Sequence, residues 1–343
     1  MQKLRIDFYE SGVGETIVIT FPSGGLGIVD AHPSKHLHRP DILNLVDGKL
    51  IHFICLTHPH EDHGLDLVKV LENHPKIECF WSTFHQTPAF IYGITQTTNF
   101  PSEVRDHVAK INQKTGEFFI DMLAAVVTRN IPTHDLRSDL EPHSIDGVEI
   151  HCLSPNEEIK NSFFDSYLKR LKDLAGRVPD INLLSAIFAV KYGDSVVLLG
   201  ADGLIKNWDC ALKVFHKRGL PKARVIKVPH HGARNAMDLR QSGKTYLDVC
   251  SQTPKAKAII FAGDSNHPDD DVYQKIKAKT EPICLTNGRK PVGNKQNPLN
   301  IQMAGAVHVY PAPVCNPIIS LELDEIGDVN VLAGNHCNLS CVA

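Results

Sequence analysis

Four side chains that can bind a metal ion lie within six residues of the chain, at His58, His60, Asp62 and His63. An extended segment directs His58 and His60 to the same face, because they are two residues apart. Imidazole nitrogens and carboxylate oxygens are common zinc ligands. Asp62 and His63 cannot easily join the first two on a single ion, so we expect them to bind a second ion beside it. The cluster follows an apolar segment and precedes a helical one, which favours a metal centre over a histidine-rich surface loop.

Three later segments with strand-like apolar patterns also end in possible ligands or proton donors. Asp202 ends the segment LLGAD, where its carboxylate could bridge two ions or simply cap a turn. One of His230 and His231, in VPHHG, would complete the second ion, and the other would lie beside the substrate. His267 precedes Pro268 and could donate a proton or contact the substrate; the plainer alternative is an ordinary turn histidine.

Apolar patterns predict the elements that must position these residues. Residues 51–57 form a nearly continuous apolar run, typical of a strand buried on both faces, and residues 65–73 have helical spacing. Further strands are expected at 3–9, 15–21, 27–30 and 148–155, in a hairpin of 183–193 with 194–202, and before the histidines at 230 and 267. Helices are expected at 103–114, 116–128 and 157–176. Because sites in layered α/β folds gather at strand ends, we expect the histidines and aspartates to meet there.

Composition limits the classes of protein to which the chain can belong. Its 343 residues are 42% hydrophobic and 22% charged, which suits a globular protein with a large core. The net charge of −3 excludes a global basic field for nucleic acid. No run reaches the roughly 18–20 apolar residues of a membrane span, and the first residues lack the pattern of a signal peptide. Nine scattered cysteines, an odd number, favour reduced thiols and a cytoplasmic location.

The motifs together resemble the metallo-β-lactamase superfamily, whose signature is His-x-His-x-Asp-His after a strand. The finer resemblance is to the hydrolase domain of the DNA-uptake protein ComEC and its soluble relatives. The segments that carry it span residues 4–280 in the family's order: IDFYESGVGETIVITF, IVDAHP, LLGAD, IKVPHHG and NHPDDDVYQKI.

This resemblance implies a four-layer αββα sandwich of the α/β class. We expect one domain over residues 1–343, with a largely helical insertion around 85–180 and a strand-rich C-terminal extension from about 280. It also implies that His58 and His60 hold the first metal ion. The implied ligands of the second ion are Asp62, His63 and one of His230 and His231, with Asp202 bridging the ions and Asp30 orienting the metal loop.

One position departs from the family pattern. Many members supply a further histidine to the first ion, about twenty residues before the bridging aspartate. Residues 180–185 of this chain, DINLLS, contain no histidine. Asn182 or Asp180 could take its place, and His134 is a more distant alternative. Occupancy of the first site therefore stays open at this stage.

The resemblance implies a metal-dependent hydrolase that uses a metal-activated hydroxide. We expect two zinc ions, with manganese or iron as alternatives for a mixed histidine and carboxylate site. Asp62 would orient the hydroxide, and either the spare histidine of the 230–231 pair, taken as His230, or His267 would protonate the leaving oxygen.

A phosphodiester, in a nucleic acid or a small nucleotide, is the expected substrate. Lys227, Arg234 and Arg240 lie near the motifs and favour a phosphate group. Two alternatives stay open: hydrolysis of a carbonyl substrate such as a β-lactam, lactone or thioester, and a regulatory module that binds metal without catalysis.

Overall fold

The chain forms two β-sheets. The computed structural model describes residues 3–11, 14–33, 41–84, 116–173, 179–237, 244–252, 256–261, 267–285, 318–324 and 328–333. The first sheet has the order β15-β14-β1-β2-β3-β4-β5-β6, formed by β1 (Leu4–Ser11), β2 (Gly14–Thr20), β3 (Leu26–Val29), β4 (Ile51–Leu56), β5 (Phe80–Ser82), β6 (Thr133–Asp135), β14 (Ile318–Leu323) and β15 (Val329–Ala333). The second has the order β13-β12-β11-β10-β9-β8-β7, formed by β7 (His143–Ile145), β8 (Val148–Ser154), β9 (Ile187–Tyr192), β10 (Ser195–Leu199), β11 (Val225–Lys227), β12 (Lys257–Phe261) and β13 (Glu281–Leu285).

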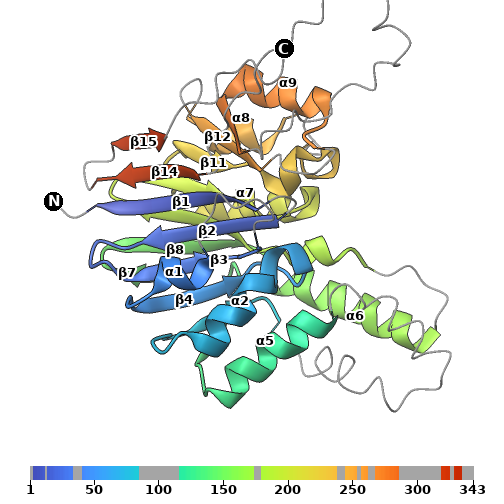
Figure 1. Cartoon of the computed structure of the whole chain (residues 1–343). Coiled ribbons are helices and arrows are strands. Elements are labelled where there is room, and N and C mark those ends of the chain that lie inside the picture. The colour runs from blue at the N-terminus through green and yellow to red at the C-terminus, as the bar shows by residue number, and fades with distance from the viewer. Residues whose placement is uncertain are drawn as a thin grey trace, which may run out of the picture.

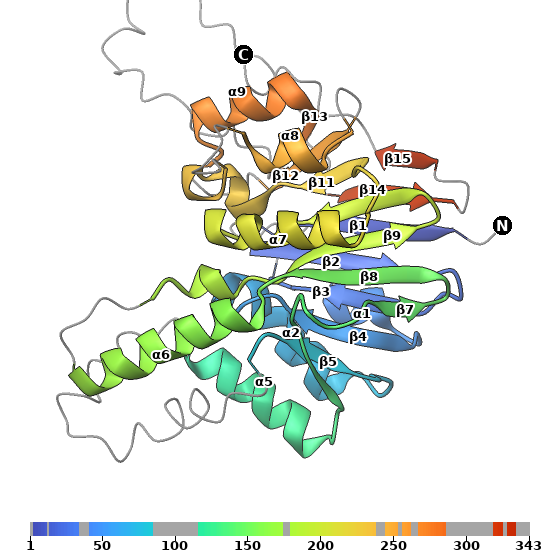
Figure 2. The same ribbon diagram turned by 180° about the vertical axis from the view of Figure 1, so that it is seen from behind.

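Helices cover the outer face of each sheet. Those beside the first sheet are α1 (Ile42–Val46), α2 (Glu61–Asn73), α5 (Gly116–Thr128) and α6 (Glu157–Asp173) (Figure 1). Those on the second sheet are α7 (Ile205–Lys217), α8 (Tyr246–Cys250) and α9 (Asp270–Lys279), and Figure 2 shows α7 from that side. Short 3₁₀ turns lie at η2 (Ile181–Leu184), η3 (Pro229–Gly232) and η4 (Arg234–Ala236).

Three apolar clusters separate the layers. The alternation of side chains along each strand sends one set between the sheets and the other set outward. In β4, Phe53 joins the cluster between the sheets, whereas Ile54 joins the cluster under α1, α2 and α5. In β10, Val197 lies between the sheets and Val196 packs with the helices of the second sheet. The four-layer αββα sandwich predicted from the sequence is therefore confirmed.

Parallel strands bring the predicted site segments to one end of the sandwich. β3, β4, β5 and β6 are mutually parallel in the first sheet, and β10, β11, β12 and β13 are parallel in the second. Asp30 follows β3, the segment 57–63 follows β4, Asp202 follows β10 and His230 follows β11. The carboxyl ends of the two parallel sets therefore supply the candidate ligands.

Most of the expected elements are present, with shifted ends. The helix expected at 65–73 begins at Glu61, so its first turn contains part of the metal loop. Helices at 116–128 and 157–173 match two of the three expected in the insertion, and 103–114 lies outside the described residues. Strands β6 to β8, between these helices, belong to the two sheets. The division into one domain with an insertion and an extension stays a prediction.

Two further sequence predictions concern membrane-spanning segments and the state of the cysteines. None of the helices in the described ranges combines the length and apolar character needed to cross a bilayer. Five cysteines of those ranges are free thiols: Cys55, Cys79, Cys152, Cys210 and Cys250.

Replacing Phe53 tests the packing between the sheets. Its ring is buried and stacks on Trp81 with centroids 3.9 Å apart. We expect Phe53→Ala to lower the free energy of unfolding by about 3–5 kcal/mol, because it removes buried area and leaves a cavity. Urea denaturation measures the change. Val127→Ala is the control, since Val127 is 73% exposed and its loss should change stability by no more than about 0.5 kcal/mol. Equal stability of both variants would contradict the assigned core.

Candidate metal centre

Asp30 fixes the loop that follows β4. Its Oδ1 accepts a hydrogen bond of 2.8 Å from the backbone nitrogen of Thr57, and its Oδ2 accepts one of 2.7 Å from the Thr57 hydroxyl. His63 Nδ1 donates to the same Oδ2 at 2.7 Å. Asp30 is fully buried, so these bonds satisfy a carboxylate that water does not reach. The residue thus holds both ends of the histidine segment, in the orienting role predicted for it.

The hydrogen bonds of Nδ1 orient four imidazoles in the same sense. His58 Nδ1 lies 3.1 Å from Thr57 Oγ1, and because the Thr57 proton goes to Asp30, the histidine donates here. The corresponding acceptors are Asp30 for His63, Asn235 Oδ1 for His230 at 3.0 Å, and the carbonyl oxygen of Phe261 for His231 at 2.9 Å. An imidazole whose Nδ1 donates leaves Nε2 as the nitrogen that can bind a metal.

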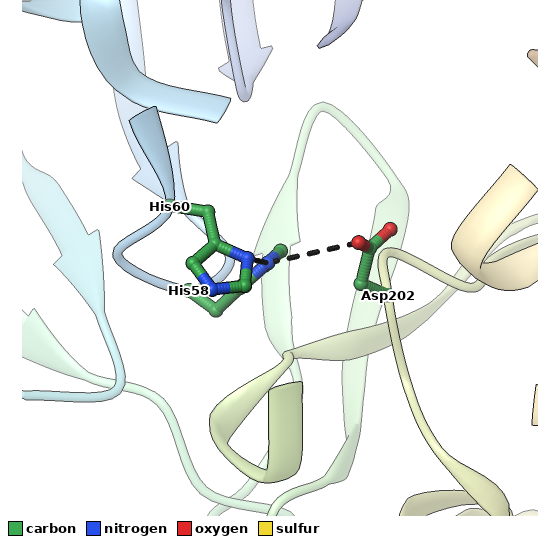
Figure 3. Close-up of side chains that lie close together, drawn as sticks. All are labelled: His58, His60 and Asp202. Carbon is green, nitrogen blue, oxygen red and sulfur yellow. Dashed lines mark hydrogen bonds and ion pairs between the residues drawn. The ribbon is translucent and has the colours of Figure 1, made fainter. Parts of the chain in front are cut away.

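The Nε2 atoms of three of these histidines lie close to Asp202. Its Oδ2 lies 3.9 Å from His58 Nε2 and 3.7 Å from His230 Nε2, and its Oδ1 lies 3.7 Å from His63 Nε2. His60 differs from these histidines because it presents Nδ1 rather than Nε2. Its Nδ1 lies 3.0 Å from His58 Nε2. Ligand atoms of His58, His60 and Asp202 all lie within 4.8 Å of one another, and Figure 3 shows the three side chains facing a common space. The spacing allows one ion to contact all three.

The electrostatics of this space favour a cation. Burial alone would lower the pKa of His63, but Asp30, Asp62 and Asp202 raise it well above its usual value. Burial alone would raise the pKa of Asp202, yet His63 in particular keeps it well below the usual range, so the carboxylate is ionised. Burial and the neighbouring His63 hold the pKa of His58 well below its ordinary value, which keeps that ring neutral. His58 is thus in the neutral form that binds metal, whereas a metal ion at His63 would displace the proton that its raised pKa retains.

Backbone strain collects around the same point. Asp30, Ala201, His230 and His231 have φ between 42° and 55°, a region that residues other than glycine rarely adopt. The other such residues of the described ranges, Asn130 and Asp146, lie in turns. Such conformations persist only where the surrounding structure imposes them. The fold therefore forces the chain into unusual conformations where it presents the candidate ligands.

The histidines of the second sheet differ in depth. His231 is buried, and burial lowers its pKa to about 4. His230 is half-buried, and its ring centroid lies 6.1 Å from that of His267, which is also half-buried. His230 and His267 thus line the outer rim, while His231 lies deeper.

Some predicted residues lie outside the converging group. Asp62 is half-buried and acts on the pKa of His63, but the groups of ligand atoms found in the described residues do not include it. His134 contacts Trp81 and places its Nε2 2.7 Å from that of His143, so it does not supply the missing ligand. Arg240 lies outside the described residues. The assignment of Asp62 to the second ion stays a prediction.

The segment that lacks the family's extra histidine does lie beside the metal loop. The backbone nitrogen of Ala186 donates to the carbonyl oxygen of Thr57 at 3.0 Å. Asn182 is buried, and its Oδ1 has no hydrogen-bond partner among the described residues. Asp180 is exposed and accepts a hydrogen bond from the Asn182 backbone instead. Of the two substitutes considered, Asn182 is the one with an unpartnered buried oxygen.

The sequence reasoning missed Glu15. It is fully buried at the start of β2, and its ligand atoms lie within 4.8 Å of those of His63 and Asp202. Burial raises its pKa to about 7 against the lowering effect of Lys227. The available signal was a charged residue directly after a Gly-x-Gly turn, at the head of the otherwise apolar strand segment ETIVITF.

Lys227 is not the substrate contact suggested by the sequence. Its side chain is 0% exposed and forms an ion pair with Glu15. Its ammonium also donates to the carbonyl oxygen of Ala201 at 2.8 Å. The expectation was wrong because a sequence cannot reveal a partner on the opposite sheet.

The donor set fits a transition metal. His63 Nε2, Asp202 Oδ1 and Glu15 Oε2 are buried atoms with no hydrogen-bond partner in the described part of the chain. Unpartnered buried polar atoms are costly, and their occurrence in three residues whose ligand atoms lie within 4.8 Å of one another indicates that another group completes their contacts. Nitrogen and carboxylate oxygen donors suit zinc, and manganese or iron less specifically.

Comparisons with known proteins identify similar folds only. No family model matches the chain, and no curated protein does. Zn²⁺-bound PqqB from Methylobacterium extorquens is 10% identical with a TM-score of 0.43, covering 82% of this chain and 97% of its own. A metallo hydrolase from the archaeon Ignicoccus hospitalis is 11% identical with a TM-score of 0.42, covering 81% and 95%. A mutant of the β-hydroxylase CmlA is 15% identical with a TM-score of 0.40, covering 82% of this chain but only 52% of its own. At these values the likeness concerns the fold and carries no argument about activity.

Replacing Asp30 tests whether it orients the metal loop. We expect Asp30→Asn to weaken zinc binding by roughly 10–100-fold, because the amide cannot accept all the hydrogen bonds from Thr57 and His63. Zinc titration against a competing chelator measures the affinity. Asp41→Asn is a matched control, since Asp41 is exposed and caps α1, and asparagine caps equally well. Unchanged affinity in Asp30→Asn would contradict the orienting role.

Proposed function

We propose that this chain is a metal-dependent hydrolase that acts on a phosphodiester of a nucleic acid or nucleotide. The observation that carries the proposal is the convergence of His58, His60 and Asp202 on one space, with the unpartnered His63 nitrogen beside them. A structural zinc site is normally closed by four ligands, and this site offers more donors than one such ion needs. We therefore propose two zinc ions, with manganese or iron as alternatives.

The ligands we propose for these ions come from both sheets. His58 and His60 would hold the first ion, and Asp202 would contribute a carboxylate to both. His63 and Asp62 hold the second ion together with His231, which we prefer over His230 because its ring is deeper and its Nδ1 is fixed by Phe261. When bound, zinc supplies Lewis acidity and lowers the pKa of water from 15.7 to about 7.

The rim residues have a different role in this proposal. His230 and His267 are half-buried and face each other, so they can reach both solvent and a bound substrate. We assign them to hold a proton at a ring nitrogen and pass it to the leaving oxygen. Asp62, close to His63, orients the attacking water.

The preference for a phosphodiester rests on two supports. One is the resemblance of IKVPHHG and the following motifs to the ComEC-like hydrolases. The other is Arg234, three residues beyond His231, whose guanidinium is 65% exposed. Asp269 and Asp271 hold that guanidinium in place, and a planar guanidinium suits a phosphate group.

A carbonyl substrate is the second candidate. It is favoured by the burial of Lys227, which removes one of the cations that supported a phosphate. A β-lactam, lactone or thioester makes a smaller demand for positive charge beside the metal centre than a phosphodiester does.

Metal content and turnover test the proposed function together. We expect about two zinc ions per chain and hydrolysis of bis-p-nitrophenyl phosphate that a chelator abolishes and zinc restores. Elemental analysis and absorbance of released nitrophenol measure these. Bound metal with turnover of nitrocefin or a thioester alone would favour the carbonyl candidate. Absence of any transition metal after reconstitution would contradict both.

Replacing Asp202 separates an enzyme from a metal-binding module. We expect Asp202→Ala to lower turnover by more than the roughly 10–100-fold typical of residues that only hold a ligand. Asp194→Ala, in the exposed hairpin turn after β9, is the control and should leave turnover unchanged. Circular dichroism checks that both variants fold. Unchanged turnover in folded Asp202→Ala would contradict the assigned role, whereas absence of turnover in the metal-loaded wild-type protein would support a module without catalysis.

A further inference from the structure

Glu15 and Lys227 face each other across the inside of the sandwich. In β2, Glu15 is in phase with Ile17 and Ile19, which belong to the cluster between the sheets. In β11, Lys227 is in phase with Val225 of the same cluster. Their side chains form an ion pair and are 1% and 0% exposed. The pair therefore bridges the two sheets in a region that is otherwise apolar.

A contribution to folding stability does not explain this buried ion pair. The cost of taking two charges out of water can exceed their attraction, and an apolar pair of similar volume is often as stable. Lys227 donates to the carbonyl oxygen of Ala201, directly before Asp202, and its ammonium lies 5.6 Å from the ring centroid of Phe261. The lysine is thus bound to the segment that presents Asp202, which ties the pair to the metal centre.

The carboxylate of Glu15 lies close to the candidate metal ligands. Lys227 pairs with Oε1, whereas Oε2 is buried and has no hydrogen-bond partner among the described residues. Ligand atoms of Glu15, His63 and Asp202 lie within 4.8 Å of one another. His63 Nε2 and Asp202 Oδ1 are unpartnered in the same way. Three buried residues thus place potential metal ligands within reach of one another.

Gly14 allows this approach. A Cβ atom at Gly14 would lie 2.4 Å from the backbone oxygen of Asp62 and 2.4 Å from His32 Cβ. Only glycine lets the start of β2 pass so close to the metal loop. The residue that follows is Glu15, so the close approach delivers its carboxylate to the site.

We propose that Glu15 is an oxygen ligand of the metal ion held by His63 and Asp202, and that Lys227 fixes its other oxygen. The inference rests on the proposed function, since it requires a metal ion at that site. It adds a ligand from β2 to the set that comes from the strand ends. A dication there replaces the missing contacts of all three buried donors at once.

Two variants test the ligand, each chosen to preserve the fold. Glu15→Gln with Lys227→Met removes both charges together, so no lone buried charge remains. Glu15→Asp keeps the charge opposite Lys227 but retracts the carboxylate by one methylene. The control is Glu72→Gln, which alters an exposed carboxylate near the end of α2, away from the metal loop. Elemental analysis counts zinc ions, and competition with a chelator gives the affinity of each ion.

We expect both Glu15 variants to lose at least about tenfold in affinity for one of the two ions, with Glu72→Gln unchanged. Unfolding in urea without metal identifies a variant that fails to fold, and the other variant then decides. Wild-type affinity for both ions in a folded Glu15 variant would overturn the ligand role. If the wild-type protein binds two ions and hydrolyses its substrate, and the Glu15 variants bind both ions equally well, only the ligand role of Glu15 is refuted. A wild-type protein that binds no metal sinks the proposed function as well.

Discussion

The hydrogen bonds accepted by Asp30 are the interaction on which the candidate site depends. Its buried carboxylate accepts hydrogen bonds from the backbone nitrogen and hydroxyl of Thr57 and from the ring of His63. Because the Thr57 proton is committed to Asp30, the Thr57 oxygen is left to accept from His58. The orientation of two imidazoles therefore follows from a single residue at the end of β3. Backbone hydrogen bonds from Ala186 to Thr57 and from Ala31 to His63 also hold the loop, but they do not orient the imidazoles.

The two sheets of the sandwich each contribute residues to the candidate site. The parallel strands of both sheets end at the same edge, so Asp202 and His231 from one sheet meet the histidine loop of the other. The space between the sheets is otherwise filled by apolar side chains, which keeps water away from the donors. Unpartnered nitrogens and oxygens would be costly there. Their persistence in several residues is explained most simply by a shared cation.

The sequence predicted what local pattern encodes and missed what arises across the sandwich. Strand β4, helix α2 and the histidine loop follow from apolar periodicity and ligand spacing, and the αββα order follows from the motifs. Lys227 was misread because its partner, Glu15, lies more than two hundred positions away on the opposite sheet. The same separation concealed Glu15 as a candidate ligand. Tertiary pairing of charges leaves no periodic signal in either strand.

Anomalous diffraction from crystals grown with zinc tests the central claim most directly. Data collected on both sides of the zinc absorption edge locate bound zinc without reference to activity. We expect a peak bonded to the Nε2 atom of His58 and the Nδ1 atom of His60 at about 2.0–2.1 Å. A second peak is predicted beside His63, with Asp202 between the two. Peaks confined to surface histidines, with these residues hydrogen-bonded only to one another, would contradict the account.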